Sequence, residues 1–177
     1  MVGGVPLKRL SLILCMLLVV CILVACSHED GTKEVAETLR IDLSSGQMVK
    51  HTDMHGGFHG DGYTFTQFHF DKTAGASAAK QMDKGGGWSK LPLTENLQRA
   101  LYGKEDDGAS YGALVQTDDG DTLIPAIENG FYYFYDRHSE SRNPRDSTPL
   151  FSRSSYNFTI SLYDSDSGNL YYYELDT

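Results

Sequence analysis

The N-terminal segment constrains what this chain can fold into, because it determines where the rest of the chain must fold. Lys8 and Arg9 precede a run over residues 10–24 that is apolar except for Ser11, and the run ends at Ala25 and Cys26. A basic segment, a short apolar segment and a small residue at the cleavage point are typical of a secretory signal. We therefore expect residues 1–25 to be a signal peptide and the remaining chain to fold outside the cytoplasm.

An uncleaved transmembrane helix is the alternative, because the apolar run nearly reaches the roughly 17 to 25 residues that span a bilayer. The run lacks the basic flank of a stop-transfer segment, which favours the signal peptide. The rest of the chain faces outward in both cases.

Residues 23–26, with the sequence Leu-Val-Ala-Cys, resemble the lipobox of bacterial lipoproteins. The resemblance implies that a diacylglyceryl group is attached to the thiol of Cys26 and that signal peptidase II cuts before this residue. Two or more acyl chains hold a protein stably on a bilayer. We expect the mature protein to be lipid-anchored in the cell membrane and to face outward.

Removal of residues 1–25 would leave 152 residues, a length that suits one domain with its own core. Cys15 and Cys21 would be lost, so Cys26 would be the only cysteine of the mature chain and no disulfide or cysteine zinc site is expected. Loss of two of the 15 basic residues leaves 13 against 24 acidic residues, a net charge of −11. Such a charge repels phosphate backbones and argues against nucleic acid as a partner.

The expected organisation is a signal peptide over residues 1–25, the lipidated cysteine with a flexible tether over 26–33, and a single extracytoplasmic domain over 34–177. The tether is expected because residues 27–33 are polar and have no apolar period. Alternating Leu39, Ile41 and Leu43 predict a strand and, with the turn residues at 44–46, a hairpin.

Further along the chain the pattern predicts a glycine-rich loop or irregular strand over residues 51–62 and a strand over 63–70. Alanine-rich residues 72–84 predict a helix. Trp88 is expected in the core, because large aromatic side chains dominate burial. Thr94 can cap a second short helix that ends at Gly103.

The remainder of the chain predicts a charged loop followed by strands. The loop is expected at residues 104–108. The strands, separated by turns, are expected at 113–115, 123–127, 131–135, 156–162 and 170–175, with a polar loop over 137–149. Strands, then helices, then strands favour an α+β fold in which an antiparallel β-sheet packs against two short helices.

One stretch carries the residue types of a metal site. Asp53, His55, His59 and Asp61 would point to one face of an extended chain, and imidazole with carboxylate suits zinc or another divalent ion. The glycines within this stretch make a regular strand doubtful, so a turn in which these groups bond nearby backbone is the alternative.

Three further patterns point to sites, each with a plainer reading. Residues 108–112 spell GxSxG around Ser110, but that motif needs a strand before it and a helix after it. Residues 164–168 begin like a calcium loop and then depart from its pattern, which favours a hairpin turn. The tyrosines after residue 130 could form a ligand face, although their alternation favours packing.

Taken together, the lipobox, residues 55–62, residues 88–93, residues 129–135 and the last nine residues resemble the small uncharacterised lipoproteins of Gram-positive anaerobes. The resemblance implies a surface lipoprotein and brings no activity or site residues. We expect a non-catalytic domain of the cell envelope that binds an envelope protein or a small ligand and needs no cofactor. The alternatives are a metal-binding protein or metal-dependent enzyme using the loop of His55 and His59, and a structural or inhibitory lipoprotein that acts through its tyrosines.

Overall fold

The computed structural model describes residues 31–56, 60–106, 109–117 and 119–177. The chain divides into two units, residues 1–38 and residues 39–177. The described part of the first unit, residues 31–38, is helical, so the last residues of the predicted tether already belong to a helix. The predicted signal peptide and Cys26 lie outside the described residues. Within the described ranges, no helix is both long enough and apolar enough to cross a bilayer.

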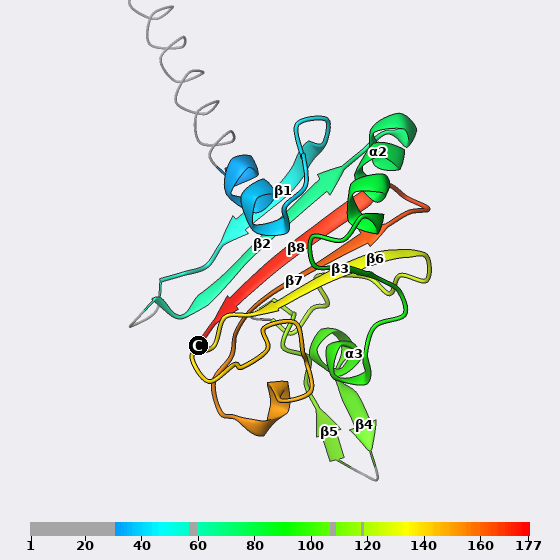
Figure 1. Cartoon of the computed structure of the whole chain (residues 1–177). Coiled ribbons are helices and arrows are strands. Elements are labelled where there is room, and N and C mark those ends of the chain that lie inside the picture. The colour runs from blue at the N-terminus through cyan, green and yellow to red at the C-terminus, as the bar shows by residue number, and fades with distance from the viewer. Residues whose placement is uncertain (1–30, 57–59, 107–108, 118) are drawn as a thin grey trace, which may run out of the picture. The chain divides into compact units, whose positions relative to one another are not determined.

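The second unit is built on a six-stranded sheet in which every neighbouring pair is antiparallel (Figure 1). In spatial order its strands are β1 (Gln47–Asp53), β2 (Gly62–His69), β8 (Asn169–Asp176), β7 (Asn157–Asp164), β6 (Gly130–Asp136) and β3 (Trp88–Lys90). The remaining elements are α2 (Lys72–Asp83), α3 (Glu95–Tyr102), the 3₁₀ turn η2 (Leu150–Ser152) and a two-stranded sheet of β4 (Lys104–Asp106) and β5 (Ala109–Tyr111). The predicted α+β class with an antiparallel sheet and short helices is confirmed.

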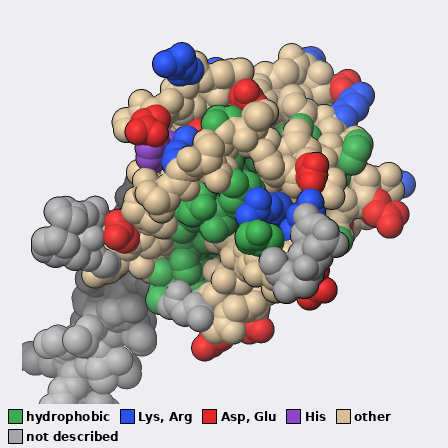
Figure 2. All heavy atoms as spheres, turned by 90° about the horizontal axis from the view of Figure 1, so that it is seen from below, with side chains coloured by type: hydrophobic (Ala, Val, Ile, Leu, Met, Phe, Trp, Pro, Cys, Tyr) green, Lys and Arg blue, Asp and Glu red, His purple; other side chains and the backbone are tan. Residues whose placement is uncertain are grey.

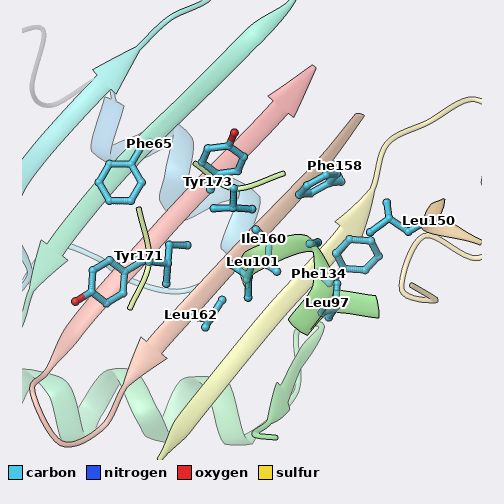
Figure 3. Close-up of a cluster of buried hydrophobic side chains, with 13 residues drawn as sticks. Phe65, Leu97, Leu101, Phe134, Leu150, Phe158, Ile160, Leu162, Tyr171 and Tyr173 are labelled. Atoms are coloured by element: carbon cyan, nitrogen blue, oxygen red, sulfur yellow. The ribbon is translucent and has the colours of Figure 1, made fainter. Parts of the chain in front are cut away.

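One face of the sheet packs against α3 to form the main core (Figure 3). Alternate residues of the central strands point to this face, as the two-residue period of a strand requires. The core side chains are Phe65, Leu97, Ala100, Leu101, Val115, Ile124, Phe134, Leu150, Phe158, Ile160, Leu162, Tyr171 and Tyr173. The helix begins where predicted, because the Thr94 hydroxyl accepts from the Leu97 amide at 3.4 Å. It ends at Gly103, whose φ of 74° suits glycine.

The helix α2 lies beside β3 and β6 and buries Ala78 and Met82. Its predicted position is confirmed, and Asp71 caps it by accepting from two amides at 2.8 Å each. Trp88, at the start of β3, is buried with its ring centroid 5.6 Å from that of Tyr133. This confirms the prediction that the single tryptophan plugs the core.

The predicted hairpin around Leu39, Ile41 and Leu43 is wrong. Residue 39 ends a helix, Arg40 has a φ of 57°, and the chain then runs irregularly to β1. All three apolar residues are nevertheless buried. Trp88 Nε1 donates to the Leu39 carbonyl at 3.0 Å, so this carbonyl is hydrogen-bonded to a side chain and not to a neighbouring strand. The alternation of apolar and polar residues therefore predicted correctly that these side chains are buried, but it predicted the wrong secondary structure.

Two other predictions change in the middle of the chain. The charged loop expected at residues 104–108 begins instead with β4, which pairs with β5. The strands expected at 113–115 and 123–127 are reduced to a single bridge between Gln116 and Thr122. Val115 and Ile124 are fully buried, so this segment contributes side chains to the core without joining a sheet.

Candidate functional site

Asp53 and His55 are the two predicted metal ligands that the structure brings together. Asp53 ends β1, and its Oδ1 lies 2.7 Å from His55 Nδ1 and accepts from the His55 amide at 3.0 Å. The His55 amide, followed by its imidazole, lowers the pKa of the Asp53 carboxyl. Asp61 is exposed, and His59 lies outside the described residues. Among the residues that the structure does describe, no three metal-ligating side chains converge.

The imidazole also lies beside a network of ion pairs on β8, although its Nε2 makes no hydrogen bond to a described residue. His55 Nε2 lies 3.4 Å from Asp176 Oδ2. Arg137 contacts Asp176 at 3.0 Å and Glu174 at 3.0 Å, and the Tyr172 hydroxyl donates to Glu174. Arginine and carboxylate in this geometry form charge-assisted hydrogen bonds.

The register of the sheet creates this network. β2 pairs with β8 so that Gly62 lies opposite Asp176 and Thr64 lies opposite Glu174, which brings the loop after β1 close to the end of the chain. Sequence reasoning missed Arg137, Glu174 and Asp176. Nothing local marks them, because they are far from His55 in sequence and only strand pairing joins them.

Ser110 does not occupy a nucleophile elbow. It lies on β5, in a two-stranded hairpin, and its side chain is exposed. The downstream histidine, His138, has its Nε2 3.0 Å from the Ser155 hydroxyl. The geometry that the GxSxG pattern requires is therefore absent at Ser110.

Residues 164–168 form the expected hairpin turn between β7 and β8. Asp164 Oδ1 accepts from the Asp166 amide at 2.9 Å, and its Oδ2 accepts from the Ser167 hydroxyl at 2.6 Å. These bonds within the turn account for its aspartate and serine residues.

Most of the clustered tyrosines on the strands pack into the protein. Tyr133, Tyr171, Tyr172 and Tyr173 are between 1% and 7% exposed. The packing interpretation is confirmed for these four. Tyr132 and Tyr135 are only partly buried, so the structural or inhibitory alternative would have to act through these two.

A different aromatic group lies at the surface around Arg99. The Arg99 guanidinium carbon lies 4.3 Å from the ring centroid of Tyr111 and 4.1 Å from that of Phe151. We call these three residues the Arg99 cluster. Its members come from α3, β5 and η2, and Tyr111 is 46% exposed. Cation–π contacts of this kind hold a guanidinium in place without using its N–H donors.

The face of the molecule seen from below in Figure 1 carries a patch of hydrophobic side chains. Figure 2 shows hydrophobic side chains gathered in the middle of the face, with Lys or Arg side chains among them. Several hydrophobic residues that pack against the core are only partly buried: Tyr63, Leu93, Leu114, Leu123, Ile127, Tyr132, Phe151, Tyr156 and Leu175. No sequence pattern announces the cluster, because its three members are brought together only by tertiary folding.

Comparison of the chain with protein-family models, curated proteins and solved structures found no match.

Proposed function

We propose that the protein is a lipid-anchored extracytoplasmic protein of the bacterial cell envelope, whose domain binds a partner without catalysing a reaction. The observation that carries the binding role is the Arg99 cluster, in which an arginine contacts two aromatic rings, one of them the exposed Tyr111. Arginine and tyrosine are enriched at the energetic centres of protein interfaces. The anchor is supported by residues 23–26, which resemble a lipobox.

Replacing Cys26 with serine tests the anchor. We expect the unchanged chain to incorporate an alkyne-labelled fatty acid and to fractionate with membranes, and the variant to lose the label. Cys21→Ser is the matched control, because this cysteine lies within the proposed signal and should not be acylated. Label retained in the Cys26 variant, or lost in the Cys21 variant, would contradict the proposal.

Photocrosslinking in intact cells tests the binding role. A photoreactive amino acid at exposed Tyr111 should give one discrete crosslinked species that disappears in an Arg99→Gln background. The same group at Lys72, on α2, is the control position. Equal crosslinking from both positions, or a product unaffected by Arg99→Gln, would show that the Arg99 cluster is not the binding surface.

Metal binding is the second candidate, because Asp53 and His55 are 2.7 Å apart and His59 and Asp61 follow within six residues. Elemental analysis of chain purified without chelator or histidine tag tests it. About one equivalent of a transition metal, absent from a His55→Ala and His59→Ala double variant, would support a metal site. His69→Ala is the control, since His69 pairs with Asn169 instead. No metal in any folded form would remove this candidate.

A further inference from the structure

We infer that the Arg99 cluster binds a carboxylate side chain of a partner polypeptide, within a segment that also presents aromatic or branched apolar side chains. This inference rests on the proposed binding function and names the chemistry of the partner.

The first reason is that Arg99 keeps its hydrogen-bonding capacity. A guanidinium has five N–H donors and no acceptor. Its contacts in the described structure are the two aromatic rings, at 4.3 and 4.1 Å. Its Nε atom is buried and has no hydrogen-bond partner among the described residues. Because Nε is shielded, a partner would contact the terminal nitrogens of the guanidinium, which carry four of its five N–H donors.

The second reason is that the nearest carboxylate on the same helix is otherwise engaged. Glu95 lies four residues before Arg99 on α3, the spacing at which helical ion pairs form. Its Oε1 instead accepts from Lys104 Nζ at 3.0 Å. Within the ranges that the structure describes, Arg99 therefore makes no ion pair and its charge remains available to a partner.

The third reason is the apolar surround, which excludes water from a bound group. The Phe151 ring lies 6.2 Å from that of Tyr156, and the Leu114 amide donates to Ala100 on α3 at 2.8 Å, so both partly buried residues adjoin the cluster. Tyr102 and Tyr111 are 38% and 46% exposed. An ionic hydrogen bond in an apolar surround is stronger than one in water.

Together these features select the ligand. The planar guanidinium matches a carboxylate through two parallel hydrogen bonds. One arginine within a chain of net charge −9 does not suit a polyanion such as nucleic acid, whose binding depends on many cationic contacts. A single carboxylate flanked by apolar side chains satisfies both the arginine and its surround.

Selection from a displayed library of random nonapeptides tests the inference, with the full chain held in lipid nanodiscs as the target. Binders to the nanodisc or to an Arg99→Gln chain are removed in a counter-selection. We expect the retained peptides to be enriched in Glu or Asp next to aromatic or branched residues. A synthetic copy of the best peptide should lose at least tenfold in affinity on Glu→Gln substitution, and a similar factor against Arg99→Lys, which keeps the charge but lacks the planar fork.

Lys90→Gln is the matched control variant, because it removes a cation that already pairs with Asp83 at 2.8 Å. It should leave peptide affinity unchanged. Retained peptides without carboxylates, or equal affinity of the Glu and Gln forms of the peptide, would overturn the inference. Either result would still be consistent with the proposed binding function of the domain. Failure to retain any peptide above the Arg99→Gln background would also overturn the inference. Binding of N-acetylphenylalanine, a small free acid added as a separate probe, would not rescue it, because the inference requires a polypeptide partner. Fatty-acid labelling at Cys26 reports on the anchor independently of these outcomes.

Discussion

Arg153 and Asp136 form a buried ion pair whose disruption should strongly destabilise the domain. Arg153 Nη2 lies 2.6 Å from Asp136 Oδ1, and the two side chains are 9% and 1% exposed. The His138 amide also donates to Oδ1, at 3.2 Å, whereas Oδ2 is buried without a hydrogen bond from any described residue, so Arg153 is the cation that compensates this carboxylate. Removing one partner of a buried pair leaves an uncompensated charge and costs about 3 to 5 kcal/mol. We expect a loss of that size in the free energy of unfolding of Arg153→Met.

Urea unfolding followed through the fluorescence of Trp88 measures this loss. The double variant Arg153→Met with Asp136→Leu should recover most of it, because replacing both members of a buried pair with apolar residues is often nearly neutral.

Lys90→Met is the control, because it breaks an exposed pair with Asp83 that should contribute about 0 to 1 kcal/mol. A loss below about 1 kcal/mol in Arg153→Met would refute the reasoning. A double variant no more stable than the single one would do the same. The pair also concerns the Arg99 cluster, because Arg153 directly follows η2, which carries Phe151. We expect Arg153→Met to weaken peptide binding as well.

Three further perturbations give distinct expected outcomes. Phe158→Ala empties a fully buried position and should cost about 3 to 5 kcal/mol in urea unfolding; a cost under about 1 kcal/mol would argue against this core. Gly130→Ala should disturb the pairing of β6 with β7, because the added Cβ would lie 1.8 Å from the Tyr163 carbonyl oxygen at a φ of 153°; amide hydrogen exchange should show lost protection there, and unchanged protection would contradict the geometry. Contacts with His55 lower the pKa of the Asp53 carboxyl below its ordinary value of 3.8. The ionised carboxylate therefore stabilises the folded state fully above pH 3.8, and this contribution is lost as the pH falls through the folded-state pKa. In Asp53→Asn the free energy of unfolding should therefore fall slightly less steeply with decreasing pH than in the unchanged chain. The difference should be small because the Asp53 side chain is 59% exposed, and identical pH dependence would exclude this contribution.

The charged network and the Arg99 cluster differ in how much of them the sequence could predict. The contact of Asp53 with His55 is local, and the spacing of these residues was sufficient to single them out. Asp176 is 121 positions from His55 in the numbering, and only the pairing of β2 with β8 brings it within 3.4 Å. The Arg99 cluster has no local component, because each of its members comes from a different element.

The sequence by itself determined features that depend on near neighbours along the chain. The apolar residues of β7 alternate with polar ones, and this period set which of its side chains face the main core. Thr94 sets the start of α3 through its hydroxyl, and Gly103 sets the end through its tolerance of a positive φ. Only the tertiary structure decided whether an apolar alternation becomes a strand, because a strand requires a hydrogen-bonding partner. Among the described strands neither Leu39 nor Val115 has a partner strand, and both side chains are buried without one. The same long-range packing places the Arg99 guanidinium against two aromatic rings and leaves its buried Nε without an acceptor among the described residues.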